Sequence, residues 1–434
     1  MVELTSPFRP VRPVEPDAFA ALRRRAIFEC CKWDPQVEDV ATLAPFPLVM
    51  RREAWNEIAA LSVALAAETA GAEEELARRP ELHGSLGLPR AVRRALAGND
   101  SPCRGAARVV RFDFHWTTGG WRISEANTDV PGGFNEASGF TRLMASEYAG
   151  TEVTARAAGD PAGALADAVA AAAPAGSAIA LVHATAYTDD RQVMTFLGRE
   201  LAARGRETVL AAPDHLRWSD GLARVESAWF RGEVGAMIRF FPGEWLPNLP
   251  RSCGWKHFFR GGRTPVSNPA AALLTQSKRF PLVWDRLERD LPTWRRLLPE
   301  TRDPRDVPRR ERRAGEGWVL KPALGRVGDG IGLAGVTPGG ALTKIRREAW
   351  WFPSWWAAQR RFEAVPHRFG EQDVYPCVGV YTVDGRVAGA YGRVARLPLV
   401  DHLAQDAAVL VEESQAESPR QGAAKEIHER AAAL

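Results

Sequence analysis

The sequence predicts an α/β protein, in the wider sense that includes α+β arrangements, with two or three domains. The chain has 434 residues, and domains average about 150 residues. Three observations support this class: apolar residues at helical spacing before residue 97, alternating β-type segments after it, and a strand–helix–strand succession in the middle. Hydrophobic residues make up 45% and charged residues 25%, which indicates a folded globular chain.

The first predicted elements are helices, followed by a β-hairpin. From Asp17 to about Leu96 the pattern is mostly helical, with apolar residues three or four positions apart, as in Trp55, Ile58, Leu61 and Leu65. Residues 107–114 and 121–127 then alternate between apolar and polar side chains, and a Thr-Thr-Gly-Gly turn separates them. This succession predicts two antiparallel strands joined by a tight turn. A helical segment is expected over 136–149.

The middle of the chain predicts a small parallel unit. Residues 178–182 form an apolar strand, 190–204 a helix and 207–210 a second strand, and a short strand follows at 236–241. Strand, helix and strand in this order favour a βαβ crossover in a parallel sheet. Further on we expect strands at 318–321 and 355–362, then a hairpin of 374–383 and 387–394 around Asp384-Gly385.

The composition and the lack of targeting signals argue against several classes of protein. The net charge is only +4 and acids are interleaved with the arginines, so no nucleic-acid-binding stripe is predicted. The basic run at 309–313 lies between Pro and Gly residues and is expected to be a solvated linker. Five cysteines show no metal-ligand spacing. The N-terminus lacks a secretory pattern, and the alanine-rich stretch 162–173 contains Asp167 and is no membrane span. A cytoplasmic protein without membrane contact is expected.

Lysine is rare in this chain. Of 57 cationic residues only six are lysines, so each is worth locating, because ammonium and guanidinium groups differ chemically. Lys321 and Lys278 fall in motifs described below, Lys344 has no predicted place, and Lys32, Lys256 and Lys425 are attributed to composition alone.

The first chemical constellation lies on the predicted hairpin. Arg111 and Asp113 are two residues apart, as are Glu125, Asn127 and Asp129, so each set shares one face of its strand. Carboxylates with an amide oxygen suit a hard cation such as Mg²⁺, and a nearby arginine suits a transferring phosphoryl group. An exposed hairpin with salt-bridged polar faces would give the same spacing, and spacing alone leaves both interpretations open.

The second constellation is a lysine followed by a glycine-rich loop. Lys321 ends a predicted strand, and Gly325, Gly328 and Gly330 follow it. Backbone N–H groups can approach a phosphate where side chains are absent, and the lysine supplies a point charge. An ordinary glycine-rich turn remains the alternative at this stage.

A dinucleotide-binding fingerprint occurs at Gly330, Gly332 and Gly335, but its context is unfavourable. That fingerprint needs a helix directly after it, whereas Val-Thr-Pro-Gly-Gly follows over 336–340 and is not expected to open one. No Walker-type phosphate loop occurs anywhere in the chain.

Taken together, these motifs resemble the ATP-grasp ligases of the glutathionylspermidine synthetase family. The matching segments, in order from about residue 105 to 412, are Arg111-Phe112-Asp113, Glu125-Ala126-Asn127-Thr128-Asp129, Glu136-Ala137, Phe241-Pro242-Gly243-Glu244-Trp245, Ser277-Lys278 and Lys321 to Gly328, with Gln359 and Arg393 further on. The resemblance implies an ATP-grasp fold with a preceding helical segment and a small parallel α/β subdomain. The implied divisions are 1–104 (helical), 105–150 (metal-binding hairpin), 151–260 (α/β subdomain) and 261–434 (nucleotide-binding part and tail).

The resemblance also implies a chemistry, in which ATP converts a carboxylate to an acyl phosphate and an amine displaces the phosphate. Its cofactors would be ATP and Mg²⁺, and its partners a small-molecule or peptide carboxylate and an amine. The implied site residues are Arg111 (catalytic), Asp113, Glu125 and Asn127 (metal), Lys278, Lys321, Gly325, Arg326, Gly328, Gly330 and Gln359 (nucleotide), and Asp129, Glu136 and Arg393 (substrate).

Departures from the family pattern concern the substrate. The chain has Ala271-Ala272 where the family usually has Trp-Thr, Val130 to Gly133 where it tends to have small hydroxyl residues, and Val394-Ala395 after Arg393. We therefore expect substrates other than glutathione and spermidine, and no amidase domain. A phosphotransferase or a non-catalytic nucleotide-binding regulator is the alternative function, and the oligomeric state is left open.

Overall fold

The centre of the molecule is an antiparallel sheet built from segments far apart in the sequence. The structure is a computed structural model. It describes residues 5–33, 36–37, 40–97, 105–151, 154–314, 317–325, 330–370 and 372–413. The sheet has the order β22-β21-β20-β5-β6, and β19 pairs with β20 outside this path. Its strands are β5 (Val109–Thr117), β6 (Gly120–Asn127), β19 (His367–Phe369), β20 (Gln372–Val383), β21 (Arg386–Ala395) and β22 (Gln405–Ala407).

Both predicted hairpins are confirmed in this sheet. β5 pairs with β6, and β20 pairs with β21 around Asp384-Gly385. Asp384 and Gly385 both have positive φ values, 49° and 77°, as a two-residue type I′ turn requires. β20 also pairs with β5, so the two hairpins join into one sheet.

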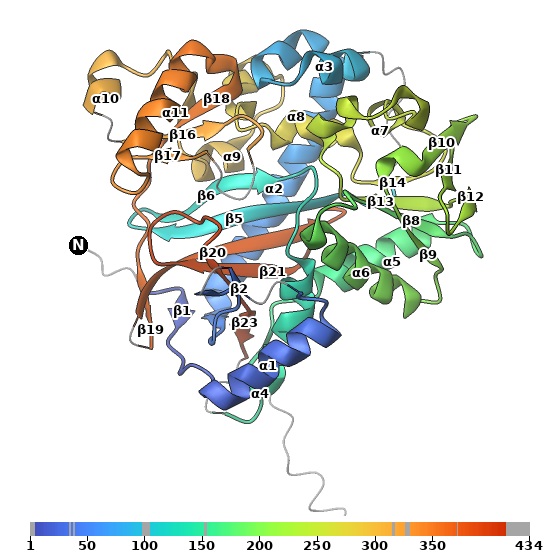
Figure 1. Cartoon of the computed structure of the whole chain (residues 1–434). Coiled ribbons are helices and arrows are strands. Elements are labelled where there is room, and N and C mark those ends of the chain that lie inside the picture. The colour runs from blue at the N-terminus through green and yellow to red at the C-terminus, as the bar shows by residue number, and fades with distance from the viewer. Residues whose placement is uncertain are drawn as a thin grey trace, which may run out of the picture.

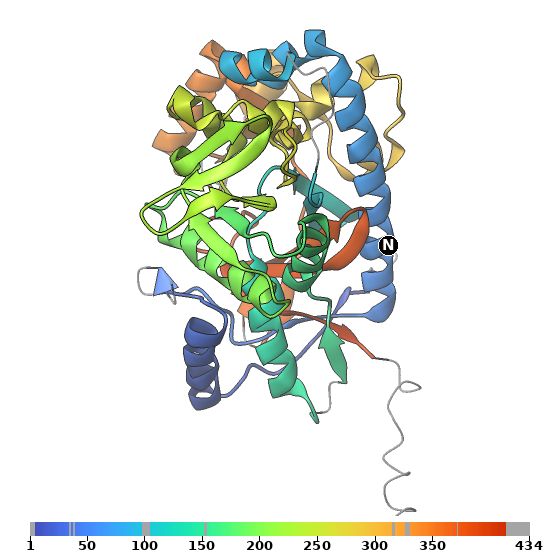
Figure 2. The ribbon, with the colours of Figure 1, turned by 90° about the vertical axis from the view of Figure 1, so that its right-hand side faces the viewer.

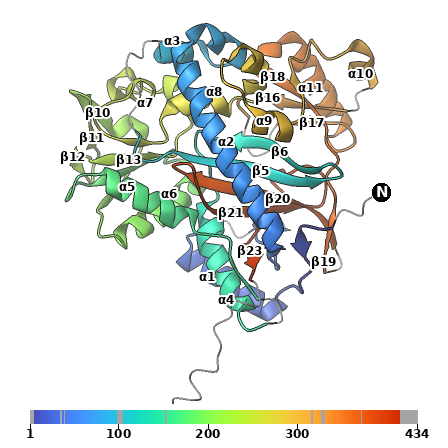
Figure 3. The same cartoon turned by 180° about the vertical axis from the view of Figure 1, so that it is seen from behind.

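A long helix covers one face of this sheet (Figures 2 and 3). α2 (Arg52–Arg78) packs against β5, β20 and β21, and in the view from behind it crosses all of them. Trp55, Ile58 and Leu65 are among its buried residues, in agreement with the helical spacing. The other helices before residue 98 are α1 (Pro16–Glu29) and α3 (Arg90–Ala97).

The predicted parallel unit is confirmed and lies beside the central sheet (Figure 1). Its strands are ordered β14-β13-β8-β9, and each adjacent pair is parallel. Its elements are α5 (Pro161–Ala172), β8 (Ile179–Val182), α6 (Thr188–Ala202), β9 (Thr208–Ala211), β13 (Ala236–Arg239) and β14 (Val266–Ser267). Between β9 and β13 the chain forms a separate antiparallel sheet of β10 (Leu216–Ser219), β11 (Leu222–Glu226) and β12 (Arg231–Glu233).

A third, antiparallel sheet holds the predicted nucleotide-side strands. Its order is β15-β18-β16-β17, and α11 packs against β16 and β17. The elements are β15 (Thr301–Arg302), β16 (Trp318–Pro322), β17 (Gly332–Leu333), α11 (Gly339–Trp351) and β18 (Trp356–Arg360).

Two expectations in this region are wrong. The basic run at 309–313 is not a linker, because α10 (Arg309–Ala314) forms there and Glu311 accepts hydrogen bonds from Trp318 Nε1 and Arg360 Nη1, both at 2.7 Å. A helix also opens within 336–340. α11 begins at Gly339 directly after Pro338, whose fixed φ suits a position just outside a helix N-terminus.

A fourth sheet brings distant segments together in the order β1-β4-β23-β7. Its strands are β1 (Phe8–Arg9), β4 (Leu48–Met50), β7 (Ala155–Ala157) and β23 (Val409–Glu412). The remaining elements include β2 (Gln36–Val37), β3 (Val40–Ala41), α4 (Thr141–Tyr148), α7 (His257–Arg260), α8 (Leu273–Gln276) and α9 (Pro292–Leu297). In the part of the chain that the structure describes, no helix has the length and apolar character to cross a membrane. The predicted boundaries at 104, 150 and 260 stay predictions.

Candidate active site

A large cleft opens between the central sheet, the β15–β18 sheet and the start of α6. Its volume is about 770 Å³, within the size range of ligand sites in enzymes. The predicted site residues that line it are Arg111, Asp113, Glu125, Asn127, Glu136, Lys278, Lys321, Gly325, Gln359 and Arg393.

The hairpin of β5 and β6 supplies the first wall of the cleft. Arg111 lies directly opposite Asn127, and Asp113 opposite Glu125, so the four side chains share one face. Arg111 donates from Nε and Nη2 to the two oxygens of Asp113, at 2.7 and 2.9 Å. Arg111 Nη1 also donates to the carbonyl of Gly132 at 2.8 Å, which fixes the guanidinium plane.

Two lysines reach the same hairpin from the other side of the cleft. Lys278 Nζ lies 3.0 Å from Glu125 Oε2 and donates to the carbonyl of Gly325 at 2.8 Å. Lys321, at the end of β16, donates to the carbonyl of Ser124 at 2.8 Å and to Gln359 Oε1 on β18 at 2.7 Å. The side chains of the two predicted constellations therefore meet, although about 200 residues separate them along the chain.

Burial and the close charges shift the pKa values of these groups. Burial raises the pKa of Glu125, but Lys278 and Lys321 oppose it more strongly and bring the pKa to about 2. Burial lowers the pKa of Lys321 to about 8, although Glu125 acts in the opposite direction. Burial and Lys321 lower the pKa of His115, which also lines the cleft, to about 4. His115 is therefore a neutral imidazole at physiological pH.

The hairpin residues fit a magnesium ion by their chemistry. A carboxylate offers about four lone-pair positions. Arg111 and Asn127 use three on Asp113, whereas Lys278 uses one on Glu125, so both acids keep accepting capacity. Across the described ranges, no group of three or more His, Cys, Asp or Glu side chains is placed to hold a metal. Two carboxylates and one amide oxygen nevertheless suit Mg²⁺, which commonly completes its shell with water and phosphate oxygens.

The glycine-rich loop is described only at its two ends. The carbonyl of Gly325 accepts from Lys278, and Gly330 has a φ of +71°, which a residue without Cβ adopts readily. Arg326 and Gly328, both predicted nucleotide contacts, lie outside the described residues.

The cleft also contains a second, buried polar cluster, which touches the hairpin site where the Tyr391 ring lies 5.1 Å from the central carbon of Arg111. Glu136 and Arg393, both predicted substrate contacts, lie there with Lys32, Asp406 and Tyr391, which the sequence did not point to. Lys32 Nζ lies 2.6 Å from Glu136 Oε1 and 2.9 Å from Asp406 Oδ2. Tyr391 donates to Asp406 Oδ1 at 2.5 Å. Lys32 therefore has a defined place in the cleft, and its attribution to composition alone is wrong.

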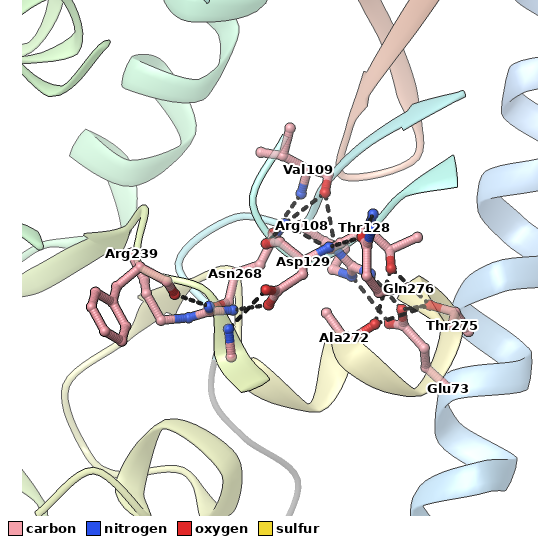
Figure 4. Close-up of polar contacts among 12 residues, drawn as sticks. Glu73, Arg108, Val109, Thr128, Asp129, Arg239, Asn268, Ala272, Thr275 and Gln276 are labelled. Atoms are coloured by element: carbon pink, nitrogen blue, oxygen red, sulfur yellow. Dashed lines mark hydrogen bonds and ion pairs between the residues drawn. The ribbon is translucent and has the colours of Figure 1, made fainter. Parts of the chain in front are cut away.

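Asp129 lies away from the cleft, in a position that does not fit its predicted substrate contact (Figure 4). Its side chain is fully buried and pairs with Arg239 on β13. Its second oxygen accepts from the backbone N–H of Gly243 at 2.9 Å. Because β6 ends at Asn127, the alternation of faces does not extend to Asp129.

Two side chains that sequence reasoning missed hold the ends of the hairpin in place (Figure 4). Asn268 Nδ2 donates to the carbonyls of Val109, Thr128 and Asp129, and its Oδ1 accepts from the N–H of Val109. Gln276 Oε1 accepts from the backbone N–H groups of Thr128 and Asp129 at 2.7 and 3.0 Å. Nothing in the local sequence marks these two amides, because their partners lie about 140 to 160 residues away.

Comparisons with known proteins bear on the family and the fold of this chain. No curated protein matches the sequence. A glutathione synthetase-like effector from Globodera pallida, solved in its apo form, shares the fold with a TM-score of 0.62 at 12% identity, covering 91% of this chain and 97% of that one. A putative γ-glutamylcysteine synthetase from Methylobacillus flagellatus reaches a TM-score of 0.44 at 13% identity over 82% of this chain and 88% of that one. The glutathionylspermidine synthase preATP-grasp family matches residues 50–412, and the chain belongs to this family of ligase-type synthetases.

Proposed function

We propose that this protein is an ATP- and Mg²⁺-dependent ligase that joins a carboxylate to an amine through an acyl phosphate. One observation carries the proposal. Three cationic side chains (Arg111, Lys278 and Lys321) and two carboxylates (Asp113 and Glu125) converge in one cleft of about 770 Å³. These three cations exceed the two acids by one charge, which favours the binding of a polyanion such as a nucleoside triphosphate.

The nucleotide side of the proposed site is the β15–β18 sheet with Lys278. Lys321 is held between the hairpin and Gln359, so its ammonium position is set before a ligand arrives. Gln359 in turn donates toward Thr301 Oγ1 at 3.4 Å, which orients its oxygen toward the lysine. Lys321 and Lys278 bind phosphate oxygens in this proposal, and Gln359 positions Lys321.

The hairpin side carries the phosphoryl chemistry. Asp113, Glu125 and Asn127 would hold Mg²⁺, which when bound supplies charge neutralisation at the phosphates. Arg111 stands beside them with its guanidinium plane fixed, and it stabilises negative charge that develops on the transferred phosphoryl group. The two carboxylates also keep Arg111 and Lys278 in place through the ion pairs already described.

The reaction balances with these components alone. An oxygen of the acid attacks the terminal phosphorus of ATP and ADP leaves. The amine nitrogen then attacks the acyl carbon, phosphate leaves and one proton is released. In this proposal the acid and the amine are small-molecule or peptide groups that bind in the cleft near Glu136 and Arg393, which line it. The changed residues around 130–133, 271–272 and 394–396 support substrates other than glutathione and spermidine.

A phosphate-release screen tests this function. A panel of carboxylic acids is combined with a panel of amines, with ATP and Mg²⁺ present. We expect phosphate release that requires one member of each panel, and loss of at least about 100-fold in Glu125→Gln. Glu57→Gln, at an exposed position of α2, serves as the matched control and should keep full activity.

Other outcomes of the screen oppose the proposal. Nucleotide turnover with one acceptor and no amine would indicate a phosphotransferase. Nucleotide binding without turnover for every pair would indicate a non-catalytic regulator.

A further inference from the structure

The polar cluster of Glu136, Asp406, Tyr391 and Arg393 already contains a bound ammonium group, that of Lys32. Lys32 is only 5% exposed, and its Nζ contacts both Glu136 and Asp406, at 2.6 and 2.9 Å. The two acids come from separate elements, the helical turn after β6 and strand β22, and both line the cleft. A pair of carboxylates that holds an ammonium inside a substrate-sized cleft is, by its chemistry, a cation subsite.

The chain places Lys32 there with a backbone fixed by several contacts. α1 ends at Glu29, and Cys31 adopts a φ of 56°, which turns the chain back so that the N–H of Lys32 donates to the carbonyl of Ala26 at 3.0 Å. The N–H of Trp33 donates to Gln192 Oε1 at 2.8 Å. Asn135 Nδ2 donates to the carbonyl of Cys30 at 2.7 Å. Residues on both sides of Lys32 are therefore anchored, and its side chain extends into the cleft.

Asp406 is also held by contacts other than the one with Lys32. The N–H of Asp406 donates to the carbonyl of Thr42 at 2.6 Å, and Tyr391 donates to its Oδ1. Arg393 Nε lies 4.0 Å from the same oxygen, and Arg393 Nη2 donates to the carbonyl of Asp401 at 2.6 Å. Glu136 and Asp406 are balanced by Lys32 and Arg393, two charges of each sign. Without Lys32, Asp406 would keep its hydrogen-bond partners, and the two acids would carry one uncompensated negative charge.

We infer that Lys32 determines which amines the enzyme accepts, because its ammonium fills the position where the second cationic group of a diamine or polyamine would bind. The acceptor of this enzyme is then an amine without a second positive charge at that distance. That the amine is an acceptor in a reaction rests on the proposed ligase function. That Lys32 excludes a second ammonium group from the cleft does not depend on catalysis.

The test measures binding, so that it does not depend on catalysis. Isothermal titration calorimetry compares wild type with Lys32→Ala, using a series of α,ω-diamines of increasing length and the monoamine of each length. We expect at least one diamine to bind Lys32→Ala at least tenfold more tightly than wild type, and more tightly than its monoamine. Adding Glu136→Gln should remove the gain. Lys344→Ala, at a surface position with 70% of its side chain exposed, should behave as wild type.

Two results would overturn the inference: a wild type that binds diamines as tightly as Lys32→Ala does, or a variant that prefers no diamine over its monoamine. If Lys32→Ala does not fold, Lys32→Ser replaces it, because its short side chain removes the charge and leaves the position of the ammonium open, and the same criteria apply. Failure of the ligase proposal would give a different result: no amine-dependent phosphate release, although Lys32→Ala binds a diamine more tightly than wild type does.

Discussion

The surroundings of Arg111 leave its guanidinium group little freedom. Two bonds to Asp113 and one to Gly132 fix its guanidinium plane, and the rings of Tyr391 and Tyr381 lie 5.1 and 5.9 Å from its central carbon. Burial would lower the pKa of Arg111, but Asp113 together with Tyr381 and Tyr391 outweighs burial and raises the pKa well above its usual value. A permanently charged, preoriented group needs little rearrangement when charge develops beside it.

Arg111→Ala should therefore slow the ATP-dependent reaction by about 100-fold or more, equivalent to about 3 kcal/mol of barrier. Steady-state phosphate release measures this effect, and circular dichroism checks that the variant is folded. Arg25→Ala, which removes an exposed ion pair with Glu29, should leave the rate unchanged. A near-native rate in Arg111→Ala would limit Arg111 to supporting the hairpin.

The pKa of Lys321 predicts that ATP affinity depends on pH. Because burial lowers its pKa to about 8, the ammonium loses its proton as the pH rises through 8, and phosphate binding should weaken. ATP affinity measured by calorimetry from pH 6.5 to 9.5 should fall above pH 8 in wild type. Lys321→Arg keeps its charge and should show no such fall, and equal pH profiles for the two proteins would contradict the assignment.

The effect of Lys321 on stability has the opposite sign to its effect on ATP affinity. Between pH 8 and the ordinary pKa of 10.5 the unfolded chain retains a proton that the folded chain has released, so the free energy of unfolding rises with pH.

The site residues divide clearly into those that spacing can predict and those that it cannot. Arg111 and Asp113 could be placed on one face because the strand period of two holds along β5. Asp129 could not, since β6 ends two residues before it. Lys32 enters the cleft from the end of a helix more than 100 residues away from Glu136, and no local pattern encodes that approach.

Strand β1 shows how one short element is held by contacts that sequence patterns do not reveal. Ser6 Oγ lies 3.0 Å from His367 Nδ1, and the Phe8 ring meets the His367 ring edge-on at 5.0 Å. Burial lowers the pKa of His367 to about 4. The unfolded chain protonates this histidine near pH 6.5, so the stability that neutral His367 provides is present above pH 6.5 and is lost as the pH falls toward 4.

The expected loss from His367 is about 3 kcal/mol over this window, at about 1.4 kcal/mol for each unit of pKa difference. Urea unfolding at pH 7 and pH 4.5 should show a smaller pH effect in His367→Phe than in wild type. His402→Gln, at an exposed position, should keep the wild-type difference. His115, His83 and His183, whose pKa values are also lowered by burial, contribute to the slope that remains. An unchanged slope in His367→Phe would refute the assignment.

Elements defined by turn chemistry and by period could be predicted, whereas those that depend on distant partners could not. The Asp384-Gly385 turn favours φ > 0 at both positions, so its hairpin was visible in the sequence. α10 is a run of charged residues without an apolar face, and Glu311 contacts Trp318 and Arg360, which come later in the chain. A sequence window around α10 contains Trp318, but it contains neither Arg360 nor the geometry that brings the three side chains together.

At the scale of the whole molecule, the buried pair of Asp129 and Arg239 joins the hairpin to the parallel sheet. Both side chains are fully buried, and Arg239 also donates to the carbonyls of Asn268 and Phe241. Removing one partner leaves an uncompensated charge between two parts of the fold. Such a change usually costs about 3–5 kcal/mol, whereas an exposed pair contributes about 1 kcal/mol or less.

Asp129→Asn and Arg239→Met should each lower the free energy of unfolding by several kcal/mol, and the double variant should lose clearly less than their sum. Urea titrations of the four proteins complete the cycle, with Arg25 and Glu29 as an exposed control pair. KM for the acid and amine should stay unchanged in Asp129→Asn. A raised KM with wild-type stability would restore the substrate contact predicted from the sequence.

The sheet β1-β4-β23-β7 has a consequence for how the chain is made. β4, at residues 48–50, has β1 on one side and β23, at residues 409–412, on the other. During translation, β1 and β4 are complete some 360 residues before their sheet can acquire its third strand. The strands β1 and β4 are therefore present in the nascent chain long before β23 is synthesised. A fragment that stops short of residue 409 leaves one edge of β4 unpaired. We expect such fragments to aggregate, as exposed strand edges do.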